Sequence, residues 1–345
     1  MASLRILVLA GGKSPEHEVS ILSAKSLLEA TEGTHLDVSW LLVGRDGMWL
    51  SPETSAQTRD IKSLEKGSHH PGEMVHRLTE WDVVFPMIHG STGEDGRLQA
   101  LLELHGVPYM GSGVLASALC MHKAASKHVL ENGGVPVASW REYRQSHWST
   151  DPKAVLDDAL GKLTFPLFVK PSEQGSSVGI TMVKERGELK NAIEQAFSYG
   201  PSIVIESGVS PLREIEISLL GNDTITTSRP GEIVYEDDFY SYETKYTPGR
   251  SSTVIPAEIP TAVVERIQEL AVKSYELLGC AGFARADFLY NPDTQELFFS
   301  EINTLPGFTP FSMFTKMWEA EGLSYLEIVE KLAKLAIDLH GPALR

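Results

Sequence analysis

The chain has 345 residues, which is enough for two or three domains of roughly 100–150 residues each. Its 42% hydrophobic and 22% charged residues are those of an ordinary soluble globular protein and exclude a low-complexity chain. A formal net charge of −16 argues against binding nucleic acid through a broad basic surface, so a polyanion would have to meet a local cluster of lysines and arginines. The two cysteines, Cys120 and Cys280, match no metal-ligand spacing, so we expect buried thiols in a reducing compartment.

The first third of the chain predicts a parallel, doubly wound α/β domain. Strands are expected over residues 4–10, 36–43, 82–88 and 107–110, and helices over residues 18–30, 96–105 and 114–132. The ligand site of such a sheet lies at the carboxyl ends of its strands, where residues 11–20 and 89–96 are found. The N-terminus leads into the first strand without a signal-peptide pattern, and no apolar run is long enough to cross a bilayer. We therefore expect a cytoplasmic protein without membrane contact.

Several polar residues at this edge of the sheet have both a structural and a functional interpretation. Glu16 lies just before the first helix, where its carboxylate favours the helix dipole or binds an ammonium group in the cleft. Glu94 and Asp95 open the helix expected at 96–105 and are interpreted as capping residues. His89 ends the preceding strand, which places it near a substrate.

The middle of the chain carries candidate nucleotide-binding residues. Strands are expected over residues 165–171, 179–184, 202–207 and 214–221, and a helix over residues 186–197, with residues 136–149 as the passage into this region. Lys170 ends a strand and precedes a loop with Ser176 and Ser177, whose N–H and hydroxyl groups can bind phosphates, although a plain flexible loop has the same composition. Glu206 and Glu214 lie at a transition from a strand to a hinge, and Glu214 suits the hydroxyls of a ribose, but isolated glutamates are more often solvated.

Residues 229–253 are polar, rich in glycine and tyrosine, and expected to form a long irregular loop. Four of its side chains suggest a lid that closes over a substrate and excludes water: Tyr240, Tyr242, Lys245 and Tyr246. A structural loop is nearly as compatible with this composition. Helices are expected over residues 261–278 and 325–340, on either side of the last pair of strands.

That last pair of strands, residues 283–290 and 297–302, reads as a hairpin and is the most informative segment of the chain. Because side chains alternate along a strand, Arg285 and Asp287 share one face, and so do Glu301 and Asn303. Carboxylate and amide oxygens suit Mg²⁺, and a metal beside an arginine is typical of phosphoryl transfer. The alternative is a surface hairpin with scattered charges.

Taken together, these segments resemble the D-alanine–D-alanine ligases of the ATP-grasp superfamily, from the Gly11-Gly12-Lys-Ser-Pro-Glu16 segment to Met313. The resemblance implies a mixed α/β, three-domain ATP-grasp architecture whose N-terminal domain is the doubly wound parallel one. Its expected parts are an N-terminal substrate domain (1–123), a central ATP-grasp subdomain (124–230), and a C-terminal subdomain with the mobile loop and the metal site (231–345). It implies ATP-dependent ligation of two D-alanines through an acyl phosphate for peptidoglycan precursor synthesis, in a homodimer.

The resemblance also implies a role for each candidate site residue. ATP would be bound by Lys123, Lys170, Ser177, Glu206, Val209 and Glu214. Two Mg²⁺ ions, with Mn²⁺ as a substitute, would be held by Asp287, Glu301 and Asn303. The catalytic set would be Glu16, Ser176, Tyr246, Arg285 and the Gly307 backbone N–H. The D-alanines would also meet His89, Lys245, Ser312 and Met313.

The family pattern has two departures and one selectivity residue in this chain. His122 stands where the family has aspartate, and Ala100 where it has glycine; neither removes a group that the chemistry needs. Tyr246 accompanies dipeptide formation in the family, so D-alanine is the expected acceptor rather than D-lactate or D-serine.

Three other functions remain open at this point. The nearest is a different ATP-grasp carboxylate–amine ligase, which makes another dipeptide or closes a ring derived from D-serine. The second is a non-catalytic nucleotide-binding protein of the same fold, which the complete set of charged residues argues against. The third, a dinucleotide-dependent oxidoreductase, rests on a partial glycine motif at Gly111 that lacks its acidic partner.

Overall fold

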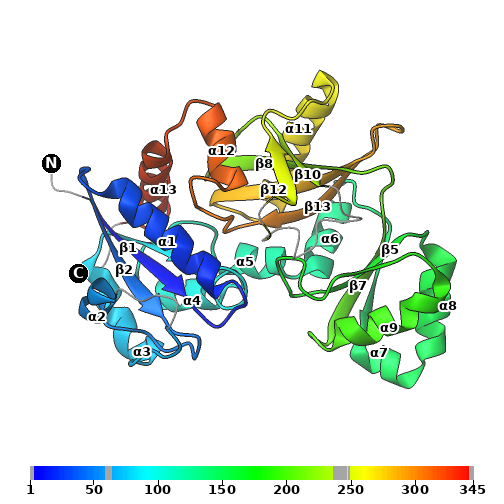
Figure 1. The fold of residues 1–345 in the computed structure, drawn as a ribbon, viewed down its shortest axis with the longest axis horizontal. Coiled ribbons are helices and arrows are strands. Elements are labelled where there is room, and N and C mark those ends of the chain that lie inside the picture. The colour runs from blue at the N-terminus through cyan, green and yellow to red at the C-terminus, as the bar shows by residue number, and fades with distance from the viewer. Residues whose placement is uncertain (1–3, 59–63, 236–246, 248, 342–345) are drawn as a thin grey trace.

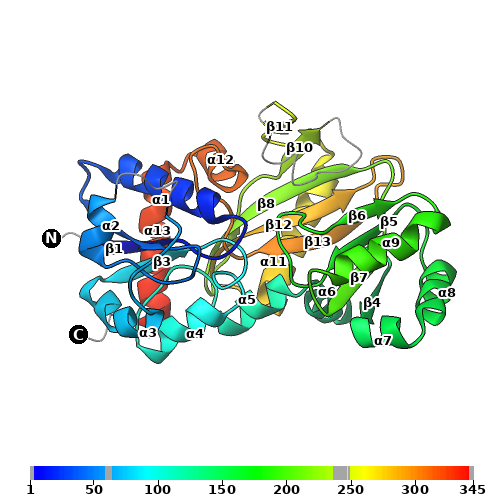
Figure 2. The same ribbon diagram turned by 60° about the horizontal axis from the view of Figure 1, so that its bottom comes forward.

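The computed structural model describes residues 4–58, 64–235, 247 and 249–341. Three sheets are arranged along the long axis of the molecule (Figures 1 and 2). A three-stranded parallel sheet lies at one end, a small antiparallel sheet with its helices lies at the other, and the largest sheet lies between them. The expected α/β class is confirmed.

The N-terminal sheet has the order β2-β1-β3, and all its pairs are parallel. Its strands are β1 (Leu4–Gly11), β2 (Leu36–Val43) and β3 (Val83–Met87). The helical segments of this part are α1 (His17–Thr31), α2 (Pro52–Gln57), α3 (Pro71–Met74), η1 (Val75–Glu80), α4 (Arg97–Leu104) and α5 (Val114–Met121). Strand β1 is buried along most of its length because helices or loops cover both faces of a parallel sheet.

The small antiparallel sheet has the order β4-β7-β5-β6. Its strands are β4 (Trp140–Arg144), β5 (Leu167–Pro171), β6 (Thr181–Val183) and β7 (Ser202–Ser207). Three helices accompany it: α7 (Gln145–Thr150), α8 (Pro152–Lys162) and α9 (Arg186–Phe197). Their apolar side chains form one core with the strands, which leaves the opposite face of the sheet to the neighbouring part of the molecule.

The largest sheet has the order β11-β10-β8-β12-β13, and β9 pairs with β8. Its strands are β8 (Arg213–Gly221), β9 (Thr226–Thr227), β10 (Gly231–Tyr235), β11 (Ser251–Val254), β12 (Gly282–Tyr290) and β13 (Leu297–Asn303). The helices around it are α6 (Lys123–Asn132), α11 (Thr261–Leu277), α12 (Met313–Ala320) and α13 (Tyr325–His340). The expected hairpin is present as the antiparallel pair β12–β13.

Alternation along β8 and β12 separates a core face from a polar face. Ile215, Ile217 and Leu219 pack with α11 in one apolar cluster. Glu214 and Glu216 alternate with these apolar residues along β8, so their side chains point to the other face of the sheet. The polar face of this sheet is the one that carries the candidate site.

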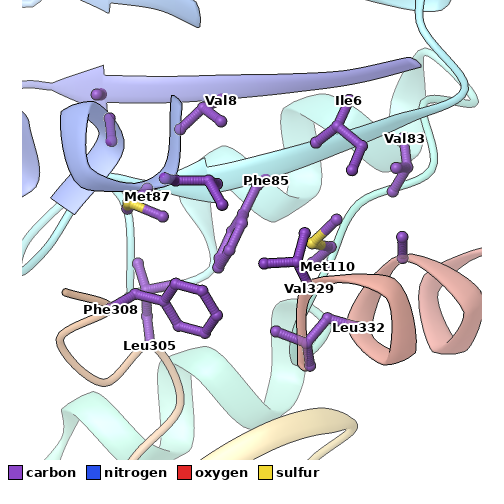
Figure 3. Packing of buried hydrophobic residues seen from close by; sticks show 14 of the residues in the cluster. Ile6, Val8, Val83, Phe85, Met87, Met110, Leu305, Phe308, Val329 and Leu332 are labelled. Atoms are coloured by element: carbon purple, nitrogen blue, oxygen red, sulfur yellow. The ribbon is translucent and has the colours of Figure 1, made fainter. Parts of the chain in front are cut away.

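An aromatic cluster joins the N-terminal sheet to the C-terminal part of the chain. The ring of Phe85 on β3 packs edge-on against Phe283 at 5.8 Å and against Phe308 at 5.0 Å between centroids. Figure 3 shows Phe85 pointing toward Phe308, beside Val329 and Leu332 of α13. Because Phe308 follows Gly307, this packing fixes a site loop against the N-terminal sheet.

The structure corrects four expectations about local structure. Residues 107–110 form no strand, and only Tyr109 bridges to Val84. The helix expected over 114–132 is two helices, because the backbone of His122 is extended between them. The irregular stretch 229–253 includes β10 and β11 at its ends, and the passage 136–149 holds β4 and most of α7. Helices α2, α3, α8 and α12 and the helical segment η1 were not anticipated.

Candidate active site

Three adjoining cavities lie along the polar face of the largest sheet, and Glu301 lines all of them. The first, between the two antiparallel sheets, is lined by Lys123, Lys170, Ser176, Ser177, Glu206, Val209, Glu214 and Asp287, among others. The second includes Glu16, Lys123, Ser176 and Asn303. The third includes Glu16, His89, Arg285, Asn303, Gly307, Ser312 and Met313. The structure thus brings together the candidate residues that it describes.

The predicted hairpin brings its four functional residues into two cross-strand pairs on β12 and β13. Asp287 lies opposite Glu301, and Arg285 lies opposite Asn303. Arg285 donates two hydrogen bonds of 2.7 Å to the two carboxylate oxygens of Asp287. Burial alone would lower the pKa of Arg285, but Asp287 and Glu216 raise it well above its ordinary value. The guanidinium is therefore a permanent positive charge in the cavity.

Glu216 is a site residue that the sequence analysis missed. Its Oε2 lies 3.0 Å from Nε of Arg285, and the side chain is buried. The signal was present in the sequence, because Glu216 follows Glu214 by two positions on a strand and must share its face.

The chemistry of Asp287, Glu301 and Asn303 fits a divalent cation. Their donors are two carboxylates and an amide oxygen, which suit Mg²⁺. Each carboxylate already lies near a cation, since Arg285 binds Asp287 and the ammonium of Lys123 lies 3.6 Å from Glu301. Asn303 Oδ1 accepts a hydrogen bond from Leu305 N, which holds the amide in place. The described residues contain no group of three or more His, Cys, Asp or Glu side chains that could hold a metal, and this set has two carboxylates and one amide.

Two buried ion pairs meet at Glu206, which lines the first cavity. Glu206 binds the ammonium of Lys170 through Oε1 and that of Lys127 through Oε2, the latter at 2.9 Å. Burial would raise the pKa of Glu206, but the two lysines lower it to about 2. Glu214 instead accepts a hydrogen bond of 2.6 Å from the hydroxyl of Tyr235. Of the residues named here, Lys127 and Tyr235 were not singled out from the sequence.

Two loops meet at Glu16. Ser176, in the loop after β5, donates a hydrogen bond from Oγ to Glu16 Oε1, just before α1. The backbones of Ser176 and Ser177 have φ of 50° and 59°, the left-handed region, so this loop turns sharply over the cavity. Glu16 makes no side-chain capping bond to α1, which favours the ligand-binding interpretation of this carboxylate.

Glu94 faces His89 rather than capping a helix, which corrects the sequence interpretation. Its Oε1 lies 3.7 Å from His89 Nδ1, and the residue at the N-cap of α4 is Gly96, with no side-chain capping bond. Asp95 does accept hydrogen bonds from the backbone N–H groups of Thr92 and Arg97. His89 Nδ1 also lies 3.2 Å from the Leu305 carbonyl.

The His89–Glu94 pair lies on the wall of the third cavity. Burial would lower the pKa of His89, but Glu94 raises it above its ordinary value, and burial raises the pKa of Glu94. His89 Nε2 is buried and has no hydrogen-bond partner within the described part of the chain. A buried nitrogen in this state fits a position against a bound substrate.

Ser312 and Met313 stand at the start of α12, on the wall of the third cavity. Ser312 Oγ accepts a hydrogen bond from Thr309 N at 3.1 Å, which orders the loop before the helix. Lys316, one turn further along α12, lines the same cavity and was not anticipated. Lys245 and Tyr246, together with Tyr240 and Tyr242, lie outside the described residues.

His122, the departure from the family pattern, caps the helix that begins with Lys123. Its Nδ1 accepts a hydrogen bond of 3.2 Å from Ala125 N, which satisfies a free amide of α6. An aspartate would accept the same bond, so the substitution keeps the start of this helix. Lys123 donates from Nζ to the Gln174 carbonyl at 2.6 Å. Within the described residues, no helix has the length and apolar content needed to cross a membrane.

Comparisons with known proteins give a consistent result. The D-ala D-ala ligase N-terminus model matches residues 5–112, and the D-ala D-ala ligase C-terminus model matches residues 129–334. The D-alanine–D-alanine ligase of Deinococcus radiodurans is 46% identical over 97% of this chain and 98% of its own length. The enzyme of the same name from Enterococcus hirae is 39% identical over 97% of this chain and 96% of its own.

Solved structures agree with the sequence relatives. The D-alanine-D-alanine ligase from Coxiella burnetii superposes with a TM-score of 0.81 at 33% identity, covering 99% of this chain and 95% of that one. The VanG D-Ala:D-Ser ligase from Enterococcus faecalis gives 0.80 at 33% identity, covering 97% of this chain and 99% of that one. The similarity therefore extends over all three sheets.

Proposed function

Because the chain belongs to the D-alanine–D-alanine ligase family, we propose that it joins two D-alanines into D-alanyl-D-alanine while converting ATP to ADP and phosphate. The product would supply peptidoglycan precursor synthesis. The observation that carries the proposal is that Glu301 lines all three adjoining cavities, while Arg285 lines the third beside it. Lys123, Lys170 and Glu206 line the first cavity, where the nucleotide would bind, and Glu16 lines the second and third, where the D-alanines would bind.

Three parts of the chain would divide this work, residues 1–123, 124–230 and 231–345. The first contains the parallel sheet and Glu16, and the second contains the small antiparallel sheet with Lys170. Strands β8 and β9 come from the second part but pair in the largest sheet, so they tie the two ATP-grasp parts together. We further propose that the protein is a homodimer that acts in the cytoplasm.

The first step is attack of a D-alanine carboxylate oxygen on the γ-phosphorus of ATP, which breaks the bond to ADP and forms an acyl phosphate. Lys123 and Lys170 would bind the phosphates, with Ser177 of the loop after β5 beside them. Glu206, Val209 and Glu214 would bind the adenosine. Asp287, Glu301 and Asn303 would hold two Mg²⁺ ions, or Mn²⁺ in their place, and these would supply positive charge beside the phosphate oxygens.

In the second step the amine of the second D-alanine attacks the acyl carbon, and phosphate leaves from a tetrahedral oxyanion. Arg285 and the Gly307 N–H would stabilise that oxyanion, where fixed donors act most strongly. Glu16, within a set that includes Ser176 and Tyr246, would bind the ammonium of the first D-alanine, and His89 would lie beside it. The second carboxylate would be held by Lys245, Ser312 and Met313.

Phosphate release tests the proposal when it is measured with D-alanine, L-alanine or D-lactate, each with and without Mg²⁺, and combined with mass analysis of the product. We expect D-alanyl-D-alanine only with D-alanine and Mg²⁺ present. A second candidate is a ligase with another acceptor, because a D-Ala:D-Ser ligase is among the similar structures. Preferential formation of D-alanyl-D-serine or D-alanyl-D-lactate from mixed substrates at neutral pH would select that candidate.

A further inference from the structure

Three charged side chains form a buried chain at the nucleotide end of the site: Lys127, Glu206 and Lys170. Lys127 and Glu206 are each only 3% exposed, and their charged atoms are 2.9 Å apart. Lys170 binds the other oxygen of the same carboxylate. One buried carboxylate thus has two ammonium partners, which is one more than its charge requires.

The two lysines differ in what else they can reach. Lys170 and Glu206 line the first cavity, together with Lys123. Lys127 is not on that wall, although it lies one turn after Lys123 on α6 and therefore on the same side of the helix. It binds Glu206 Oε2 without lining the cavity in which a nucleotide would bind. Lys127 is therefore placed to act on Glu206 and not on a ligand.

The second ammonium matters when Lys170 changes partner. If Lys170 were the sole partner of Glu206, turning toward a phosphate would leave a buried carboxylate uncompensated, which is strongly unfavourable. With Lys127 in place, Glu206 keeps a charged hydrogen-bond partner throughout. The low pKa of Glu206, at about 2, agrees with a carboxylate that stays ionised in this environment.

Building on the proposed ATP-dependent function, we propose that Lys127 is a positioning residue. It is the permanent counter-ion of Glu206, and it frees Lys170 to bind the phosphates of the nucleotide. Its effect on the reaction would pass through nucleotide affinity, so it differs from Lys123 and Lys170, which would touch the phosphates themselves. Binding of D-alanine should not depend on it.

Calorimetric titration of the full-length protein with ADP and with adenosine, both without D-alanine, separates these effects. We expect Lys127→Met to weaken ADP binding by roughly 10–100-fold, the size of one charge-assisted hydrogen bond, and to change adenosine binding by much less. Lys127→Arg keeps the charge and should retain ADP affinity within a few-fold. In turnover, the KM for ATP should rise in Lys127→Met while the KM for D-alanine stays unchanged.

A double-mutant cycle with Glu206→Gln distinguishes this role from a structural one. In Glu206→Gln, Lys170 no longer has to break an ion pair with Glu206 before it binds a phosphate. Adding Lys127→Met to Glu206→Gln should therefore not weaken ADP binding further. This comparison also decides the matter if Lys127→Met alone fails to fold. Equal ADP affinities of Glu206→Gln and the double variant support the proposal.

Three results would overturn it: wild-type ADP affinity in Lys127→Met, equal losses of ADP and adenosine binding, or a further tenfold loss in the double variant. Failure of the ligase proposal would look different. In that case the wild-type protein would bind ADP, and Lys127→Met would weaken that binding, but no dipeptide would form.

Discussion

Arg285 is shared by two carboxylates: it donates two parallel hydrogen bonds to Asp287, and its Nε lies 3.0 Å from Glu216. Asp287 is a proposed metal ligand, so a divalent cation would compete with Arg285 for its oxygens. Glu216 would then keep the guanidinium in place, because it lies on the neighbouring strand β8 and faces the same cavity. At Glu206 the sharing is reversed, because one buried carboxylate there has two ammonium partners, Lys170 and Lys127.

Replacing Arg285 by alanine should lower kcat by roughly 10²–10³, the usual cost of removing one donor to a developing oxyanion. Arg285→Lys should recover only part of this loss, because a lysine lacks the planar fork that binds Asp287. Steady-state phosphate release measures both, with circular dichroism as the control for folding. Near-wild-type turnover in Arg285→Ala would remove this residue from the mechanism.

Glu301→Gln should raise the Mg²⁺ concentration needed for half-maximal activity by roughly tenfold or more. Mutating a residue that only hydrogen-bonds a metal ligand already lowers metal affinity by about that factor, and losing a ligand should cost at least as much. A Mg²⁺ titration of turnover measures this, and a chelator should abolish activity in the wild type. Glu296→Gln, at the exposed turn of the same hairpin, is the matched control and should leave the titration unchanged. An unaltered Mg²⁺ requirement in Glu301→Gln would contradict the metal assignment.

Ser176→Ala should raise the KM for D-alanine by about 10-fold, and Glu16→Gln by up to about 100-fold, because hydrogen bonds to charged groups contribute about 1.5–3 kcal/mol. Ser176 holds Glu16 from a loop of another sheet, so its removal frees the carboxylate without removing its charge. Initial-rate measurements over D-alanine concentration at saturating ATP test both variants. If only the KM for ATP changed, Glu16 and Ser176 would belong to the nucleotide site.

The folded-state pKa of Glu206, at about 2, lies below its ordinary value of 4.5. A lowered carboxyl pKa stabilises the fold above the ordinary value, and this contribution is lost as pH falls through the folded-state value. The contribution of Glu206 to the free energy of unfolding should therefore be lost as pH drops from about 4.5 to about 2. Urea unfolding of wild type and Glu206→Gln across this range tests it, because the variant should have the shallower dependence; identical slopes would refute the assignment.

Phe283→Ala should destabilise the protein by about 3–5 kcal/mol, the usual cost of deleting a buried phenylalanine ring. Phe283 is fully buried and contacts Phe85, Phe308 and Phe314, so the cavity would lie between the N-terminal sheet and the loop after Gly307. Chemical denaturation measures the loss. Phe165→Ala, which removes a partly exposed side chain, should destabilise the protein far less. Equal losses of stability in the two variants would argue that this cluster does not hold the N-terminal sheet and the loop together.

Strong patterns in the sequence predicted the fold well. Strands β2 and β7 and helices α9 and α13 have the expected bounds, because the strands are short apolar runs and the helices have apolar residues at helical spacing. The break at His122 was invisible, since no proline or glycine marks it. Strands β10 and β11 are too short for alternation to stand out, and their pairing with distant strands decides their structure.

The site was predictable where one strand carries several functional residues. Arg285 and Asp287 share a face by alternation alone, and the resemblance supplied the roles. Lys127 and Glu94 were missed or misread for a physical reason. Lys127 pairs with Glu206 and Glu94 pairs with His89. In both pairs the two residues come from different segments, and only tertiary packing brings them together.

The central claim is that a D-alanine carboxylate is phosphorylated by ATP before the amine attacks. Single-turnover reaction of D-alanine labelled with oxygen-18 in its carboxylate, followed by mass analysis of the released phosphate, tests this directly. The account predicts one labelled oxygen in the phosphate, because the bridging oxygen leaves with phosphorus when the peptide bond forms. Dipeptide formation with unlabelled phosphate would contradict it.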